Sequence, residues 1–492
     1  MTQERRLPPN ASFLSASMRD LGYSFETAIA DLIDNSISAS ANNIEIFCVS
    51  NTESPYLAII DNGNGMNREE MVDAMRHGSS NPKEERANDD LGRFGLGLKT
   101  ASFSQCKCLT VVSSRKGQRC SAEWNLDVID EKNDWLLSIP NKDEISTLPL
   151  IERLNETGTL VLWRNLDRLF EGKSGLKRQE IVNEKIDVLE KHLSLVFHRF
   201  LSGEMRRREK LTISINGHNV ESFDPFCRKN SATQILPDET VRINGRVVRI
   251  QPFILPHHSK LSAKEHYFYQ ERSNFMSNQG AYIYRNGRLM AWGDWFRLIP
   301  KTEATKLARI QIDFPNSLDK VWEIDIKKSR AAPPLQVRER LRQIISRIIN
   351  RSVTVHQGRG KKLFSKVKKP VWERYRDQKT IRYILNGEHP LVQSLADNIG
   401  NDKINHLHVL LDAISSSLPI DMIYSDFSTH EKEMQQPPIN EDVAMDRLGK
   451  LRDALLGDRE IDVESFRDVV RSTRLFDAHT KMVEQFIQKE FR

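Results

Sequence analysis

The chain has 492 residues, a formal net charge of +6, and 39% hydrophobic and 28% charged residues. This length predicts about three domains, each with a core of its own, and excludes a disordered tail or a disulfide-stapled mini-protein. The sequence has no run of about 18 apolar residues and no apolar export signal at its start, so we expect a cytoplasmic protein without a membrane partner. Its five cysteines are scattered, which indicates reduced thiols.

A helix is predicted over residues 24–41, where apolar side chains recur at helical spacing behind Ser24, a suitable N-cap. Asp31 and Asn35 are one turn apart in this segment and therefore share a face of the helix.

Several short strands are predicted next. They start at Ile44, Tyr56, Leu109, Cys120 and Thr159, and the second leads directly into the sequence DNGNGM. Strands interleaved with helices over about 165 residues favour an α/β sandwich.

A second, β-rich domain is predicted between residues 205 and 330, where three Asn-Gly turns separate apolar runs at Asn216, Asn244 and Asn286. An amphipathic helix follows from Gln336 to Val355. Its apolar stripe consists of Leu341, Ile344, Ile345, Ile348 and Ile349.

Positive charge is concentrated after this domain. Between Lys327 and Arg376 there are sixteen Lys and Arg against two Glu. The remainder of the chain is helical in character.

Two glycine-containing motifs indicate nucleotide chemistry. Asp61 ends a strand and precedes Gly63 and Gly65, so its carboxylate could accept a hydrogen bond from the exocyclic amine of adenine while the backbone approaches the ligand. The sequence LGRFGLGLKTAS from Leu91 places three glycines before a helix, a pattern that favours a polyphosphate. It matches neither a Rossmann fingerprint nor a P-loop.

The order of these motifs resembles the GHKL (Bergerat-fold) ATPases, the superfamily of gyrase B, MutL, heat-shock chaperones and histidine kinases. It runs from an acidic residue and Asn at i, i+4 through DxGxGM and the glycine-rich segment to Gly158 and Thr159. ADLIDNSISA, DNGNGMNREEM and GRFGLGLKTAS are most similar to MORC-like and MutL-like prokaryotic ATPases. INGHNVESFDPF and GAYIYRNGRLM resemble their second, transducer domain.

The resemblance implies ATP and Mg²⁺ as cofactors, with Asn35 as the Mg²⁺ ligand. Asp61 would recognise adenine together with Thr159, and Gly65 and Met66 would line the base pocket. The phosphates would lie under a lid of Gly92, Gly95, Gly97 and Lys99. The wider set expected at the nucleotide adds Asp34, Gly63, Phe94, Leu96, Leu98 and Thr100.

The resemblance also implies two catalytic positions. Asp31 stands where the family usually has a glutamate as general base, and because aspartate is one methylene shorter we expect slow hydrolysis. Lys328, or alternatively Lys327, would contact the γ-phosphate.

The expected fold class is α+β: a Bergerat-fold α/β sandwich, an S5-type α/β transducer domain and an α-helical C-terminal region. The expected boundaries are an N-terminal arm at 1–23, the ATPase domain at 24–175, the transducer with flanking helices at 176–355, a basic linker at 356–380 and helices at 381–492.

The predicted function is a slow Mg-ATPase that dimerises on ATP binding and clamps DNA, beside a partner nuclease or other defence proteins in an antiviral (anti-phage) or restriction-type defence system. The DNA contact is expected at Lys361, Lys362, Lys366, Lys368 and Lys369. A chaperone-type ATPase acting on a protein is the alternative. A sensor histidine kinase is disfavoured, because no histidine precedes the Asn35 helix.

Overall fold

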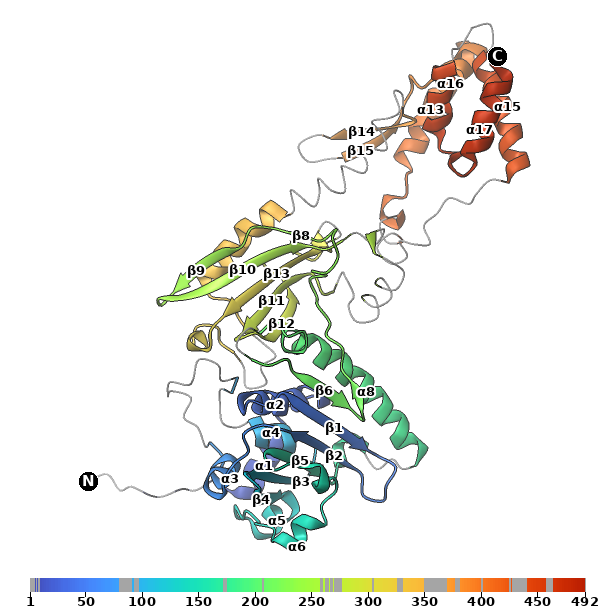
Figure 1. Ribbon diagram of the computed structural model, residues 1–492. Coiled ribbons are helices and arrows are strands. Elements are labelled where there is room, and N and C mark those ends of the chain that lie inside the picture. Colours follow the sequence, from blue (N-terminus) through green and yellow to red (C-terminus); the bar gives the residue numbers. More distant parts are fainter. Residues whose placement is uncertain are drawn as a thin grey trace. The chain divides into compact units, whose positions relative to one another are not determined.

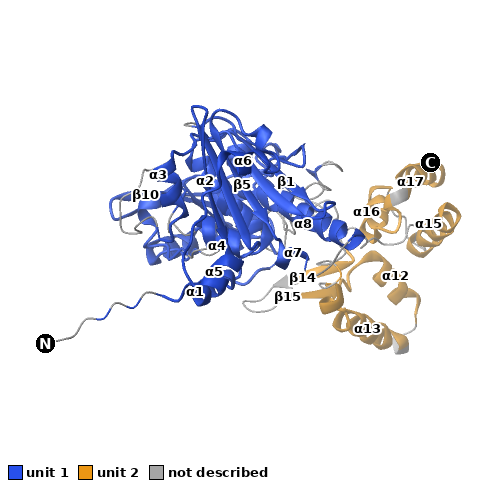
Figure 2. Ribbon diagram, turned by 90° about the horizontal axis from the view of Figure 1, so that it is seen from below, with its two compact units in different colours: residues 1–352 blue, residues 353–492 orange. Residues whose placement is uncertain are grey.

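The computed structural model divides into two compact units, residues 1–352 and residues 353–492 (Figure 2). The structure describes residues 9–78, 91–92, 97–170, 175–205, 208–256, 277–302, 305–324, 331–348, 370–376, 381–399, 401–423, 440–456 and 463–491, together with residues 5, 7, 260, 261, 265, 269 and 426.

The first unit contains a seven-stranded sheet with the order β4-β3-β5-β2-β1-β6-β7 (Figure 1). Its strands are β1 (Asn43–Val49), β2 (Tyr56–Asp61), β3 (Cys108–Arg115), β4 (Gln118–Asn125), β5 (Gly158–Arg164), β6 (Thr212–Ile215) and β7 (His218–Asn219). All neighbours pair antiparallel except β1 and β6, which are parallel. The five strands expected between residues 44 and 164 are confirmed.

Helices accompany this sheet. They are α1 (Ala11–Arg19), α2 (Phe25–Ser38), α3 (Arg68–Met75), α4 (Gly97–Phe103), α5 (Leu126–Lys132), α6 (Lys142–Ser146), α7 (Asp167–Phe170), α8 (Leu176–Val196) and α9 (His198–Leu201). The predicted helix at 24–41 corresponds to α2 and is confirmed.

The central strands are buried on both faces of the sheet. Leu57 and Ile59 of β2 belong to the larger core, which they share with helices α2, α4 and α8. Ala58 and Ile60, which point the other way, belong to a smaller core with Ile145 of α6. The first half of the chain is therefore an α/β sandwich, as expected.

The first sheet reaches further along the chain than residue 175. Strand β6 pairs with β1, with Ile213 opposite Ile44, and both side chains are fully buried in the same core. The Asn216-Gly217 turn, which was expected in the second domain, joins β6 to β7 of this first sheet. The reason is that a parallel pair joins segments far apart in the chain, and local patterns carry no trace of it.

A second sheet follows with the order β12-β11-β13-β10-β8, and β9 pairs with β10. The strands are β8 (Gln234–Ile235), β9 (Glu239–Ile243), β10 (Arg246–Ile254), β11 (Gly280–Arg285), β12 (Arg288–Asp294) and β13 (Ala308–Phe314).

All three Asn-Gly turns, one in the first sheet and two in the second, are confirmed. Each asparagine has a φ of +48°, as two-residue hairpin turns with both central residues at positive φ require.

One face of the second sheet packs on a helix formed by residues 335–348. The predicted apolar stripe is confirmed for Leu341, Ile344, Ile345 and Ile348, which are at most 2% exposed. Ile349 lies outside the described residues.

The second unit combines a hairpin with helices around a small core that includes Leu448, Phe466 and Val483. Its elements are β14 (Trp372–Arg376), β15 (Ile381–Leu385), α12 (Pro390–Asn398), α13 (Asn401–Ser416), α15 (Glu441–Leu456), α16 (Val463–Thr473) and α17 (Thr480–Glu490). Its helical character is confirmed, whereas the hairpin was not anticipated. Across the described parts of both units, no helix is long and apolar enough to cross a membrane.

Candidate nucleotide-binding site

Helix α2 supplies two polar side chains in different environments. The helix begins behind a capping box in which Ser24 and Thr27 each accept the other's backbone N–H. Asp31 is 2% exposed, and its Oδ2 accepts a hydrogen bond from the Tyr23 hydroxyl at 2.9 Å. Asn35, one turn later, is exposed. The helix thus holds a carboxylate inside the molecule and presents an amide to solvent.

Asp61 is a buried carboxylate at the end of β2, with 8% of its surface exposed. Its Oδ2 accepts a hydrogen bond from the Ser36 hydroxyl at 2.7 Å, and its Oδ1 accepts one from the Gly63 N–H at 2.9 Å. Burial raises the pKa of Asp61, while these bonds and one from the Thr159 backbone oppose the rise. The carboxylate is thus fixed in place, in an environment where a further hydrogen-bond donor is favourable.

Two glycines let the backbone close around Asp61. Gly65 has a φ of +64°, and a Cβ atom there would lie 2.0 Å from the Ser114 carbonyl oxygen. Gly158 has a φ of +149°, and its Cβ would lie 2.1 Å from the Asp61 carbonyl oxygen. Any side chain at either position would displace backbone, so both residues must be glycine for structural reasons.

A hydroxyl pair connects these segments. Ser113 Oγ accepts the Met66 N–H at 2.8 Å, donates to the Gly158 carbonyl at 3.1 Å and lies 3.0 Å from Thr159 Oγ1. Thr159 and Met66 were predicted from the sequence, whereas Ser113 and Ser36 were not. A buried serine in a predicted strand was the signal available for Ser113, but it is a weak one.

The glycine-rich segment is described at residues 91–92 and from Gly97 onward, whereas Phe94, Gly95 and Leu96 lie outside the described residues. The Leu91 N–H donates to the Ser38 hydroxyl of α2 at 3.3 Å. At the other end, Gly97 lies against Asp31: a Cβ on Gly97 would be 3.5 Å from Asp31 Oδ2. Both described ends of the segment therefore contact α2.

Lys99 lies inside the protein. It is 1% exposed, its Nζ donates to the Ala74 carbonyl at 2.8 Å, and burial lowers its pKa to about 8. Its neighbours on α4 are also inside: Thr100 is buried, and Leu98 packs against the larger core. The structure therefore places the ammonium group of Lys99 on a backbone carbonyl at the end of α3.

Asp34 faces the second sheet. Its carboxylate is fully buried and lies 3.3 Å from Arg288 Nε at the start of β12. This pair was not anticipated, because nothing local links residues so far apart in the chain.

The catalytic lysine candidates, Lys327 and Lys328, lie outside the described residues. The same holds for the five lysines expected to contact DNA, Lys361, Lys362, Lys366, Lys368 and Lys369.

The exposed amide of Asn35 fits the chemistry of Mg²⁺, a hard cation that prefers oxygen ligands. Within the described ranges, no group of three or more His, Cys, Asp or Glu side chains could hold a metal ion.

Comparison with known proteins agrees with this geometry. Residues 23–159 match the family model described as histidine kinase-, DNA gyrase B-, and HSP90-like ATPase. The match begins at Tyr23, which donates to Asp31, and ends at Thr159, which faces Asp61 across two paired strands. This part of the chain is therefore similar to the GHKL-type ATPases.

The chain is also similar to ATPase morc-1 of Caenorhabditis elegans, with 33% identity over 91 residues. These residues amount to 18% of this chain and 10% of the relative. The expected likeness to a MORC-like GHKL ATPase is therefore confirmed.

The buried Lys99 predicts a specific pH dependence of stability. Its folded-state pKa of about 8 is below the ordinary value of 10.5, so above pH 8 the folded protein loses this proton before the unfolded chain does. The free energy of unfolding should therefore rise between pH 8 and 10.5, by up to about 3 kcal/mol from this group. Urea unfolding of wild type and Lys99→Met at several pH values measures it. Equal pH slopes in the two proteins would contradict the placement of Lys99.

Proposed function

We propose that this chain binds Mg-ATP at the Asp61 site, hydrolyses it slowly, dimerises when ATP is bound and acts as a clamp on DNA. The observation that carries the proposal is the buried Asp61 carboxylate, held by Ser36 and Gly63 inside the segment that matches the ATPase family. A carboxylate in such a setting accepts a hydrogen bond from the amino group of adenine.

The groups around Asp61 have distinct roles in this proposal. Gly65 and Met66 border the base, and Thr159 supports Asp61 through its backbone. Backbone N–H groups of the segment that includes Gly92 and Gly97 bind the phosphates. Asn35 would hold Mg²⁺ through its side-chain oxygen, and the ion would supply positive charge at the phosphates.

Hydrolysis requires a base for the attacking water. Asp31 accepts a proton from that water while the water oxygen forms a bond to the γ-phosphorus. The bond between the γ-phosphorus and the bridging oxygen breaks, and ADP leaves with that oxygen. The Tyr23 hydroxyl orients Asp31 through Oδ2. The short aspartate side chain supports slow turnover, because a general base must first lie within hydrogen-bond distance of the water whose proton it accepts. Lys328 or Lys327 is assigned to the γ-phosphate by family resemblance.

Dimerisation is supported by the amino-terminal arm. Phe13 on α1 is 74% exposed and Leu7 is 79% exposed, although both are large and apolar. Helix α1 is itself anchored to its own subunit, because Arg19 pairs with Asp167 at 2.7 Å. An anchored helix with outward apolar side chains is suited to contact a second subunit.

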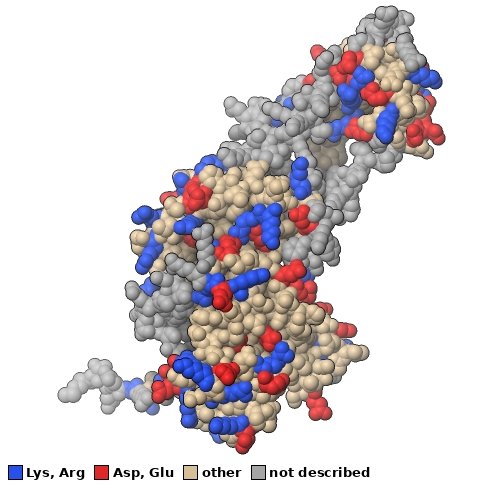
Figure 3. All heavy atoms as spheres, in the orientation of Figure 1, with Lys and Arg blue, Asp and Glu red and all other residues tan. Residues whose placement is uncertain are grey.

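DNA contact is supported by the concentration of charge between Lys327 and Arg376. On the face shown in Figure 3, basic and acidic side chains of the described residues are intermingled. Lysines in such a segment bind phosphates without reading base sequence. Action beside a nuclease in antiviral defence rests on family resemblance.

One observation favours the alternative, a chaperone-type ATPase that acts on a protein. Helix α13 carries exposed apolar side chains, with Val409 at 67% and Leu410 at 56%. Such a face is suited to a protein partner.

Asn35→Ala tests the nucleotide site. Because Asn35 supplies the direct Mg²⁺ ligand, its loss should weaken Mg-ATP binding by more than the roughly 10–100-fold that an outer-shell change costs. Isothermal titration calorimetry measures the affinity. The matched control is Asn183→Ala, an exposed asparagine on α8. Unchanged affinity in Asn35→Ala would reject the site.

Asp31→Asn tests the base. The amide can still accept the Tyr23 hydrogen bond but cannot take a proton, so turnover should fall by roughly 10²–10⁴-fold while ATP binding persists and the dimer accumulates. Phosphate release and light scattering measure the two effects, with the exposed Asp187→Asn as control. Normal turnover would place the base elsewhere.

Charge reversal of Lys361, Lys362, Lys366, Lys368 and Lys369 tests the DNA contact. If these lysines neutralise phosphates, the slope of log affinity against log salt should become shallower by about 0.9 for each phosphate that is no longer neutralised. The control reverses five exposed lysines elsewhere: Lys116, Lys132, Lys142, Lys177 and Lys185. Equal slopes would reject the segment, and no DNA binding by wild type would favour the chaperone-type alternative.

A further inference from the structure

Two arginines flank the turn between β11 and β12. Arg285 ends β11, Arg288 begins β12, and the two residues are paired across the hairpin around the Asn286-Gly287 turn. Their side chains are only 3% and 6% exposed. Both guanidinium groups contact the nucleotide-binding half of the unit, at two different places.

Arg285 contacts the start of the glycine-rich segment. It donates to the Leu91 carbonyl at 2.9 Å and to the Gly92 carbonyl at 3.3 Å. Asp319 binds the same guanidinium through both carboxylate oxygens, each at 2.7 Å. A two-point contact of this kind fixes the plane of the guanidinium, so Asp319 orients Arg285 toward the two carbonyls.

Arg288 contacts the helix that carries the expected Mg²⁺ ligand. Its partner Asp34 is fully buried and directly precedes Asn35 on α2. Separating the two buried charges would remove their direct attraction in the interior, which is strongly unfavourable. A displacement of α2 at Asn35 is therefore transmitted to β12.

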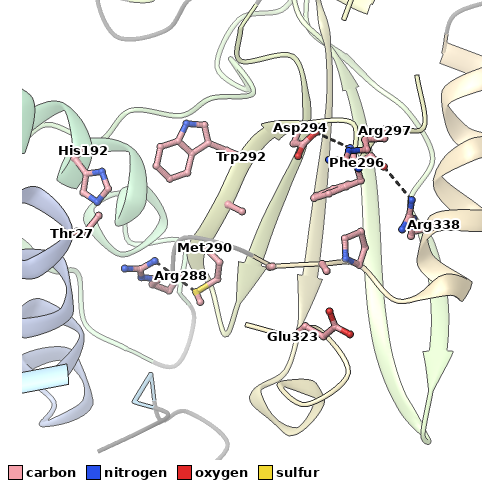
Figure 4. A pocket seen from close by; sticks show the side chains of 14 residues that line it. Thr27, His192, Arg288, Met290, Trp292, Asp294, Phe296, Arg297, Glu323 and Arg338 are labelled. Atoms are coloured by element: carbon pink, nitrogen blue, oxygen red, sulfur yellow. Dashed lines mark hydrogen bonds between the residues drawn. The ribbon is translucent and has the colours of Figure 1, made fainter. Parts of the chain in front are cut away.

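The surroundings of Arg288 favour this pairing and leave space beside it. His192 of α8 stays neutral because burial, and then the charge of Arg288, lower its pKa to about 4. A cavity of about 770 Å³ is lined in part by Arg288 and His192. Figure 4 shows Arg288 on the side of the cavity with Thr27 and His192, whereas Phe296 and Arg338 lie on the other side.

We propose that Arg285 and Arg288 are positioning residues that couple the nucleotide site to the second sheet. Arg285 contacts the backbone at Leu91–Gly92, and Arg288 contacts α2 at Asp34. Because only a two-residue turn separates the two arginines, a movement of this one hairpin changes both contacts. The inference rests on the proposed ATP site, and it specifies how occupancy of that site reaches the second sheet. Such coupling is an equilibrium property: ATP and the hairpin must favour the same arrangement.

The test measures two quantities in each variant: the affinity for ATP, and the rate of amide hydrogen exchange in the second sheet. Wild type should bind Mg-ATP and show slower amide hydrogen exchange in residues 280–294 when a non-hydrolysable ATP analogue is added. Arg285→Gln, Asp319→Asn and Arg288→Gln should lose this protection, or require roughly 10-fold more nucleotide to reach it, within the 5–150-fold range of ordinary couplings. Arg288→Lys, which keeps the ion pair with Asp34, should retain it.

Two further variants keep the outcome interpretable. The double substitution Asp34→Asn with Arg288→Gln removes both buried charges at once, so it should fold even if Arg288→Gln does not, and it should still lose the coupling. Arg309→Lys is the matched control, because Arg309 is an equally buried arginine of the same sheet that donates to the carbonyls of Lys306 and Ala308. It should leave the ATP-dependent protection unchanged.

The two proposals fail differently. If wild type does not bind Mg-ATP, the proposed function fails. If wild type binds ATP and protects residues 280–294, but the folded Arg285, Asp319 and Asp34–Arg288 variants show the same protection as Arg309→Lys, the coupling role of the two arginines is overturned.

Discussion

The nucleotide-binding half is built around a carboxylate that has been removed from water. A buried carboxylate is unfavourable unless hydrogen-bond donors surround it, and the donors to Asp61 come from three separate segments: Ser36 on α2, Gly63 after β2 and Thr159 on β5. Meeting this one requirement therefore fixes α2, the loop after β2 and the start of β5 relative to one another. Gly158 follows from it, since its backbone approaches the Asp61 carbonyl oxygen more closely than a side chain would permit.

Much of this half could be predicted because its signals are local. The helix behind Ser24, the strands with alternating apolar residues and the Asn-Gly turns each depend on neighbours within a few residues, and the structure contains them. Asp61 could be singled out because glycines follow a strand end. The features that escaped prediction depend on contacts between distant segments: β6 beside β1, Ser113 beside Thr159, and Asp34 beside Arg288. Lys99 is a related case, since its position in a glycine-rich motif does not reveal that its ammonium group turns inward to Ala74.

The junction between the two sheets contains buried charged contacts in addition to apolar packing, such as that of Trp292 on the larger core. Apolar contacts tolerate small shifts, whereas a buried ion pair and a guanidinium on two carbonyls define one relative position. Such contacts suit the proposed coupling, in which the position of the second sheet depends on whether nucleotide occupies the site beside the first sheet. The cavity beside Arg288 is consistent with this, because a fully packed boundary would resist rearrangement.

The pairing of β6 with β1 has a consequence for folding during synthesis on the ribosome. Chains emerge from the ribosome amino-terminus first, and domains generally fold as units during synthesis. Here the edge of β1 stays unpaired until Thr212–Ile215 has been made, and the core lacks Leu189 and Leu193 of α8 until that helix has appeared. The first sheet therefore stays incomplete, with an unpaired strand edge and exposed apolar surface, while about fifty further residues beyond β5 are translated. Interruption of translation within that interval would leave an incomplete sheet with an exposed strand edge and exposed apolar surface.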